Sequence, residues 1–198
     1  MKRIILASQS PRRKDLIENI KLDFEIHPSK FEELESHESP EELAIYNAVG
    51  KAQSLQRTYK DALIIGVDTV VAYKKHILGK PKDKEDAVRI LRLLSKTTHK
   101  VISAICILDT KNEKMLTETV TTLVTMDRLD ERDIEAYVNS GEGVDKAAGY
   151  AIQGLGSLFI SKIEGDYFNV VGLPINKLRK MLKKFGVKSL TNQELMIE

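Results

Sequence analysis

Two serines and two arginines follow the first apolar run of the chain at close spacing. Ser8, Ser10, Arg12 and Arg13 occupy four of six consecutive positions, with Pro11 between them. Pro11 predicts a helix start because its fixed φ suits the first helical turn, and Ser10 is a good N-cap for that helix. The helix N-terminus, the hydroxyls and the guanidinium forks would together suit a polyanion such as a phosphate chain. The spacing alone also fits an ordinary strand-to-helix turn with two solvated arginines.

A single carboxylate interrupts the most apolar segment of the chain. Asp68 follows the apolar run 62–67 and precedes a second one at 70–73. An unpaired buried charge is very costly, so this carboxylate must meet a cation, a metal ion, hydrogen-bond donors or water. Asp68 is therefore a candidate functional residue, with a structural aspartate as the alternative.

Three further features of the sequence each allow two interpretations, one functional and one purely structural. Lys51 lies in the apolar stripe of a helix predicted to start at Ser39, and its ammonium either reaches the surface or projects into a cleft. Glu33 belongs to an acidic segment, 31–35, which is either part of a functional site or an ordinary solvated loop. The small-residue stretch 145–154 suits close approach to a ligand or a tight crossing of packed elements.

The elements that must position these residues alternate between strands and helices. This alternation predicts an α/β protein, and hairpins in both halves argue against a purely parallel sheet. The pattern predicts strands at 4–7, 24–26, 62–67, 70–73, 77–78, 101–108 and 119–126, a hairpin of 157–163 with 167–171, a first helix over 11–20, and helices starting near Ser39, Asp83, Asp130 and Pro174.

Composition excludes several classes of protein. The 198 residues are enough for one substantial core, and a net charge of +2 gives no reason to expect nucleic acid or a membrane as partner. The single cysteine, Cys106, excludes an intramolecular disulfide and a cysteine-rich metal site. The four histidines form no metal-binding pattern, so any metal would be a hard cation on carboxylates, water and substrate phosphate. The chain carries neither a Walker A loop nor a signal or membrane-length segment, and we expect it in the cytoplasm.

Taken in order, the motifs resemble those of the Maf family of nucleotide pyrophosphatases. The resemblance covers residues 4 to 185 and departs from the family at Gly143, where proline is usual, and at Ala148-Gly149, which reverses the commoner order. The matching motifs are Ser8-x-Ser10-Pro11-Arg12-Arg13, Glu33, Lys51-Ala52, Val67-Asp68-Thr69, Lys80-Pro81, Asp145-Lys146-Ala147, Ile152-Gln153-Gly154, Gly165-Asp166-Tyr167 and Val171-Gly172-Leu173-Pro174.

The resemblance implies a fold and a reaction. The fold would be Maf/inosine-triphosphatase-like, with an elongated mixed central sheet flanked by helices and two lobes around a deep cleft, over residues 1–187, before a C-terminal extension at 188–198. The reaction would be hydrolysis of a nucleoside triphosphate between its α and β phosphates, with Mg²⁺ or Mn²⁺, in a possible homodimer. The alternatives are a housecleaning pyrophosphatase for non-standard nucleotides and a nucleotide-binding regulator of cell division that does not hydrolyse.

The resemblance also implies roles for individual residues. Asp68 would be the proton acceptor, and Glu33 with Asp68 would hold the metal. Thr69, with Arg12 and Gln153, resembles the subgroup that acts on dTTP and UTP and would set base specificity. The triphosphate would be bound by Ser8, Ser10, Arg12, Arg13, Lys51, Lys80 and Lys146.

Overall fold

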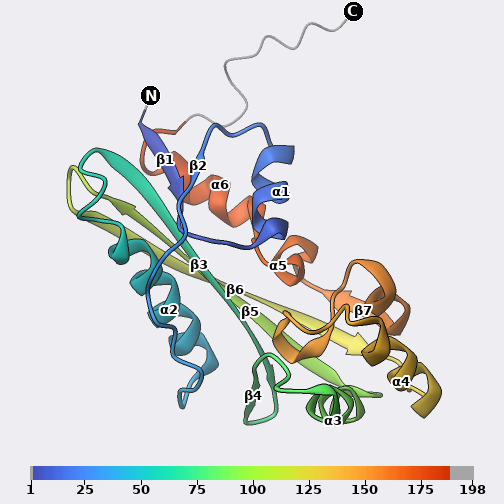
Figure 1. Cartoon of the computed structure of the whole chain (residues 1–198). Helices are drawn as coiled ribbons and strands as arrows, with labels where there is room; N and C mark the ends of the chain where they lie inside the picture. The colour runs from blue at the N-terminus through green and yellow to red at the C-terminus, as the bar shows by residue number, and fades with distance from the viewer. Residues whose placement is uncertain (1, 188–198) are drawn as a thin grey trace, which may run out of the picture.

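The structure is a computed structural model that describes residues 2–187, so the predicted extension at 188–198 lies outside the described residues. Its centre is a seven-stranded sheet in the order β2-β1-β3-β5-β6-β7, with β4 paired to β3. Figure 1 shows three long strands, β3 (Ala62–Tyr73), β5 (Thr98–Asp109) and β6 (Lys114–Met126), running the length of the molecule. These three are antiparallel, whereas β1 (Arg3–Leu6) is parallel to β3 and to β2 (Glu25–Ile26). The predicted mixed sheet is confirmed.

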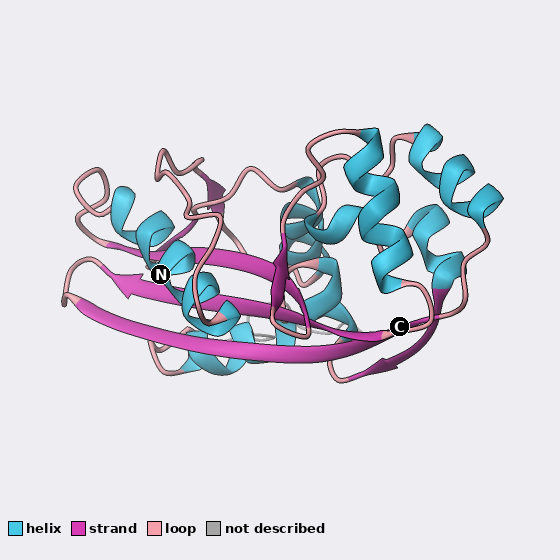
Figure 2. Ribbon diagram, turned by 90° about the horizontal axis from the view of Figure 1, so that it is seen from below, coloured by secondary structure: helices cyan, strands magenta, loops and turns pink. Residues whose placement is uncertain are grey.

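Helices cover both faces of the long strands (Figure 2). Successive strand residues point to opposite faces, so β3 sends alternate side chains into two separate cores. One core holds Leu63 and Ile65 against α1 and α6, and the other holds Ile64 against α2. A third core joins one end of the long strands to α3 and α4. The helices are α1 (Pro11–Asn19), α2 (Pro40–Ser54), α3 (Lys84–Leu94), α4 (Glu131–Ser140), α5 (Tyr167–Val171) and α6 (Ile175–Lys183).

Burial on both faces explains the continuous apolar run of β3. The strand passes through Asp68 without a break, and Asp68 lies opposite Ala104 of β5 in the ladder. The close packing of α2 on this strand depends on Gly66, where a Cβ would lie 2.0 Å from the carbonyl oxygen of Ala48. This close approach brings the inner face of α2 directly over Asp68.

The outer edge of β3 is covered in two pieces. β1 pairs with β3 up to Ile65, and the short strand β4 (His76–Leu78) pairs with it from Val71 onward. Within residues 2–187, the stretch between them has no strand partner on this edge. The edge of β3 is therefore uncovered at this gap, which is where Asp68 and Thr69 lie.

The structure corrects the hairpin predicted for 157–163 with 167–171. Residues 167–171 form helix α5, because the Asp166 carboxylate accepts hydrogen bonds from the amides of Phe168 (2.8 Å) and Asn169 (3.4 Å). Strand β7 (Ile160–Glu164) begins later than predicted and pairs with β6 instead. The preceding residues form a short 3₁₀ helix, η2 (Gly154–Phe159).

The predicted helix starts at 11, 39, 83 and 130 are confirmed to within a residue or two. Ser39 and Asp83 act as caps through their side chains, which accept from the amides of Glu42 and Asp86. Ser10 holds the cap position of α1 in an extended conformation, but its side chain makes no capping hydrogen bond. In the described part of the chain, no helix combines the length and apolar character needed to cross a membrane.

Candidate active site

A cavity of about 680 Å³ opens at the gap in the edge of β3. Its wall combines the loop after β1, the start of α1, the inner face of α2, the middle of β3, the segment 145–153 and the end of α5. All eleven residues named from the sequence line this one cavity, namely Ser8, Ser10, Arg12, Arg13, Glu33, Lys51, Asp68, Thr69, Lys80, Lys146 and Gln153. Their shared position is a finding of the structure, whereas their individual roles stay predictions.

The loop that leads into α1 is ordered by its own serine. The Ser8 hydroxyl is buried and accepts a hydrogen bond from the backbone N–H of Ser10 at 3.2 Å. Because the Ser10 side chain does not cap α1, the first-turn amides of that helix lack a side-chain acceptor. A helix N-terminus in this condition favours an anion.

Arg13 ties three separate segments together at the cavity. Its guanidinium donates to the carbonyl oxygen of Gly172 (2.9 Å), the hydroxyl of Ser8 (3.3 Å) and the hydroxyl of Thr69 (3.2 Å). Burial lowers the pKa of Arg13, although the negative charges of Asp68 and Glu33 act in the opposite direction. An arginine has five N–H donors and stays protonated in proteins, so the side chain keeps donors for a phosphate as well.

Lys51 meets both carboxylates of the cavity. Its ammonium lies 2.7 Å from Asp68 Oδ1 and 3.0 Å from Glu33 Oε1, and it donates to the carbonyl oxygen of Val67 at 3.3 Å. Lys51 is 7% exposed and Asp68 6%. The lysine therefore projects into the cleft and does not snorkel to the surface, and Asp68 has the cationic partner that its apolar surroundings require.

Asn47, one turn before Lys51 on α2, was not among the residues named from the sequence. Its side-chain amide donates to Asp68 Oδ2 at 3.3 Å and to the carbonyl oxygen of Leu34 at 3.0 Å, and it accepts from the Leu34 amide at 2.9 Å. Residues four apart lie on the same side of a helix. Asn47 could have been identified from the sequence because it is a second polar residue on the apolar stripe of this helix, four positions before the embedded lysine.

The opposite wall is formed by the segment that holds Lys146 and Gln153. The Ala148 amide donates to the carbonyl oxygen of Gly79 at 2.8 Å, which joins this wall to the loop of Lys80. Burial lowers the pKa of the Lys146 ammonium, and the positive charge of Arg12 lowers it further. An anion bound between these two cations would relieve their repulsion.

The two departures from the family pattern meet in this segment. Ala148 and Gly149 both have a positive φ, of 58° and 67°. A Cβ at position 143 would lie 2.0 Å from the carbonyl oxygen of Gly149. The turn therefore needs glycine at 143 in its present conformation, and any other residue there would displace the backbone at 149.

Tyr150, unlike Asn47, lines the cavity itself, and the sequence did not single it out. Its hydroxyl lies 2.6 Å from Nε2 of His99, which is 1% exposed. Burial lowers the pKa of His99 to about 4 and raises the pKa of Tyr150. Both rings are therefore neutral at pH 7, and this part of the wall is uncharged.

The charges of the cavity favour a polyanion. Arg12, Arg13, Lys51, Lys80 and Lys146 supply five cationic side chains, whereas Glu33, Asp68 and Asp145 supply three acidic ones. Several cations and a buried carboxylate in one cavity are suited to binding a phosphate chain and activating a water molecule against it.

Comparison with known proteins gives matches over almost the whole chain. The family described as "Maf-like protein" matches residues 3–185. A protein of Ruminiclostridium cellulolyticum named "dTTP/UTP pyrophosphatase" is 47% identical over 95% of this chain and 98% of its own length. A protein of Dictyoglomus turgidum with the same name is 45% identical, over 96% of this chain and 99% of its own.

One solved structure confirms the predicted fold at a greater distance. The Ham1 protein of Staphylococcus aureus superposes with a TM-score of 0.52 at 15% identity, covering 93% of this chain and 100% of that protein. At this identity the likeness concerns the fold alone.

Proposed function

Since this chain belongs to the Maf family, we propose that it is a nucleoside triphosphate pyrophosphatase that hydrolyses dTTP and UTP to the monophosphate and pyrophosphate. The observation that carries the proposal is the position of Asp68. Its buried carboxylate lines a cavity that also holds five cationic side chains, so a bound phosphate chain and a water-activating group would share one space. Two relatives of nearly equal length bear the name dTTP/UTP pyrophosphatase.

The triphosphate would bind at the start of α1. Ser8, Ser10 and the uncapped first turn of the helix offer neutral donors, and Arg12 and Arg13 offer planar forks that match phosphate oxygens. Lys51, Lys80 and Lys146 would complete the cationic wall. These groups would stabilise the charge that develops on the leaving pyrophosphate, which is the main requirement in phosphoryl-type transfer.

Asp68 would act as the general base. Its carboxylate would accept a proton from a water molecule as the water oxygen bonds to the α phosphorus, while the bond from that phosphorus to the bridging oxygen breaks. The departing pyrophosphate would keep the electron pair of that bond. Lys51 and Asn47 each hold one oxygen of the carboxylate, so the base is presented in one orientation.

Glu33 and Asp68 fit a divalent cation as a further part of the proposal. Both carboxylates pair with the ammonium of Lys51, Glu33 at 3.0 Å and Asp68 at 2.7 Å, so they lie close enough together to share a cation beside that ammonium. In the part of the chain that the structure describes, no group of three or more His, Cys, Asp or Glu side chains is placed to hold a metal, so water and substrate phosphate would supply the remaining ligands. When bound, Mg²⁺ or Mn²⁺ would neutralise phosphate charge and lower the pKa of a coordinated water.

Base selection would involve Gln153, Thr69 and Arg12. The Gln153 side chain is exposed at the cavity wall and does not cap η2, so its amide donor and acceptor are available to a pyrimidine edge.

Family membership also supports a homodimer, a cytoplasmic location and a single domain over residues 1–187. Sedimentation of the purified protein tests the dimer.

A triphosphate panel tests the proposed function. The purified chain is incubated with each common nucleoside triphosphate and Mg²⁺ or Mn²⁺ in ¹⁸O-labelled water, and the products are identified by mass. We expect dTTP and UTP to be the best substrates, with the label in the monophosphate because water attacks the α phosphorus. Binding of nucleotides without release of pyrophosphate would overturn the proposal in favour of a regulatory protein, and label in pyrophosphate would overturn the site of attack.

A further inference from the structure

The side chain of Asn47 is buried between the loop that carries Glu33 and the strand that carries Asp68. It is 2% exposed, and it is not among the residues that line the cavity. Its amide oxygen accepts from the Leu34 N–H, while its amide nitrogen donates to the Leu34 carbonyl oxygen and to Asp68 Oδ2. Its acceptor and both of its donors are thus in use.

These three bonds join parts of the chain that lie far apart in sequence. Leu34 is the neighbour of Glu33, and its backbone is held at both N–H and C=O by one side chain, as a strand partner would hold it. The same side chain fixes the second oxygen of Asp68, whose first oxygen is bound by Lys51. Two side chains therefore connect Glu33 with Asp68. Lys51 pairs with both carboxylates, and Asn47 joins the backbone of Leu34, next to Glu33, to the Asp68 carboxylate.

We propose that Asn47 is a positioning residue for the hydrolytic reaction, which sets the Asp68 carboxylate and the Glu33 loop in one fixed relation. The inference rests on the proposed function and adds to it a residue that does not touch the substrate. Supporting groups of this kind matter because a reacting constellation loses much of its rate when its members move by a fraction of an ångström.

Glutamine and aspartate illustrate why asparagine is needed at position 47. Aspartate has the same shape and keeps the acceptor for the Leu34 amide, but it loses both donors and turns a negative oxygen towards Asp68. Glutamine keeps the amide but adds a methylene to a buried side chain that sits between two fixed backbones. Only asparagine supplies one acceptor and two donors at this distance from α2.

The test compares Asn47→Ala and Asn47→Asp with the unaltered chain in hydrolysis of dTTP. We expect kcat to fall about 10- to 100-fold in both variants, the range typical of residues that orient a catalytic group. KM should stay within about threefold, because Asn47 makes no contact with the cavity. Hydrogen exchange should separate the two variants, since Asn47→Ala exposes the Leu34 amide and Asn47→Asp retains its acceptor.

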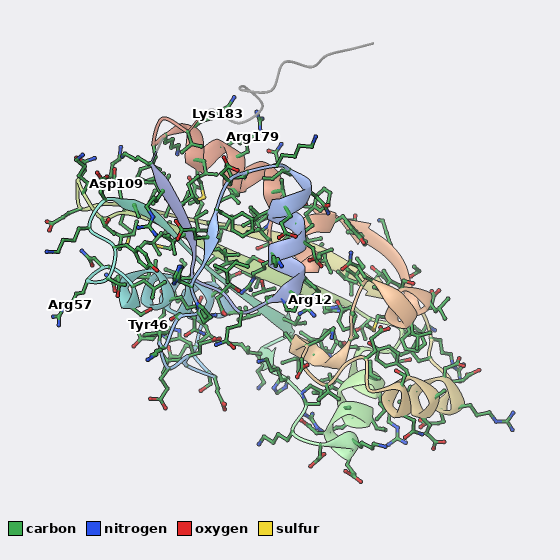
Figure 3. All side chains as sticks on the ribbon, turned by 45° about the horizontal axis from the view of Figure 1, so that its top comes forward. Arg12, Tyr46, Arg57, Asp109, Arg179 and Lys183 are labelled. Atoms are coloured by element: carbon green, nitrogen blue, oxygen red, sulfur yellow. The ribbon has the colours of Figure 1, made fainter. Side chains whose placement is uncertain are left out.

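Asp109→Asn is the matched control for a change at a buried polar side chain. Asp109 is 2% exposed and binds Lys2 and Asn112, and Figure 3 places it at the end of the sheet that lies away from Arg12. This variant should lower the melting temperature without lowering kcat. If Asn47→Ala does not fold, Asn47→Asp carries the test because it keeps the side-chain volume.

Two results would overturn the role of Asn47. One is a kcat within twofold of the unaltered chain in the folded Asn47 variants, and the other is an equal loss of kcat in Asp109→Asn at equal loss of stability. An unaltered chain that hydrolyses neither dTTP nor UTP would instead overturn the proposed function, and with it the inference.

Discussion

At the scale of single residues, the position of Asp68 follows from its chemistry. A carboxylate inside a buried strand has to be compensated, and the sequence alone indicated that a cation, a metal or hydrogen-bond donors must lie beside it. The structure supplies Lys51 at 2.7 Å and Asn47 at 3.3 Å. The lysine could be named in advance because it broke an apolar stripe, but its partner could not, since β3 and α2 are separate in sequence.

Gln153 provides a residue-scale prediction about specificity. Replacing Gln153 with alanine should reduce the preference for dTTP and UTP over the other triphosphates by roughly 2- to 10-fold, the value of one or two hydrogen bonds. Turnover of the best substrate should change less. Ratios of kcat/KM over a panel of triphosphates measure the effect, and Gln56→Ala, which lies outside the cavity lining, is the control. An unchanged set of ratios would remove Gln153 from base recognition.

His99 provides a residue-scale prediction about stability. Its pKa is about 4 in the folded chain against an ordinary value of 6.5, because the ring is buried. Between these pH values the unfolded chain binds a proton that the folded chain does not, so the free energy of unfolding falls as the pH falls. The loss should approach about 3 kcal/mol by pH 4, at 1.36 kcal/mol per pKa unit.

Urea unfolding of the unaltered chain and of His99→Gln over pH 4 to 7.5 measures this contribution. The difference between the two curves should be constant above pH 7 and should shrink steadily below pH 6.5, because the variant lacks the titrating ring. Parallel curves over the whole range would contradict a buried, neutral His99.

At the scale of elements, two glycines place α2 and its neighbours. A Cβ on Gly66 would lie 2.0 Å from the backbone oxygen of Ala48, whereas a Cβ on Gly50 would lie 2.3 Å from the ring of Phe31. The first glycine lets the helix sit on β3, and the second lets the Glu33 loop sit on the helix. A backbone atom cannot yield as a side-chain ring can, so the same substitution should have different effects at the two positions.

Gly66→Ala should destabilise the fold by about 3 kcal/mol, the upper part of the usual range for overpacking, because α2 must move off the strand. Gly50→Ala should leave the free energy of unfolding within about 1 kcal/mol, since alanine favours the helix and the Phe31 ring can turn away. It should instead speed hydrogen exchange in residues 29–35 and lower the rate of hydrolysis. Equal loss of stability in the two variants, measured by urea unfolding, would contradict this account of the packing.

Elements with a strong local pattern could be predicted from the sequence, and those fixed by distant contacts could not. Pro40 after a capping serine and the long apolar run of β3 predicted α2 and the strand correctly. Residues 167–171 were interpreted as the second strand of a hairpin that turns at 164–166, whereas the Asp166 cap makes them helical. The late start of β7 depends on Glu142, whose carboxylate accepts from the amides of Leu155 and Gly156 and so holds η2.

At the scale of the whole molecule, the site lies where the sheet leaves one edge uncovered. Figure 1 shows β1 and β4 at separate places along β3. The side chains of Asp68 and Thr69, which point to opposite faces of β3, both line the cavity between them, and segments from all three cores contribute to its wall. No single segment shows this in the sequence, since the lining residues run from Ala7 to Gly172. The resemblance to the Maf family named eleven of the residues that line the cavity in advance, and the topology of the sheet explains why they meet.

The measurement that tests this account most directly is the hydrolysis and binding of dTTP by Asp68→Asn. We expect turnover to fall by about 10²- to 10⁴-fold, the usual contribution of a general base, while calorimetry shows dTTP bound within a few-fold of the unaltered affinity. The cationic wall is intact in this variant, and the asparagine keeps the shape of the side chain. Undiminished turnover, or a loss of binding with an unchanged turnover number, would contradict the role of Asp68 as the base.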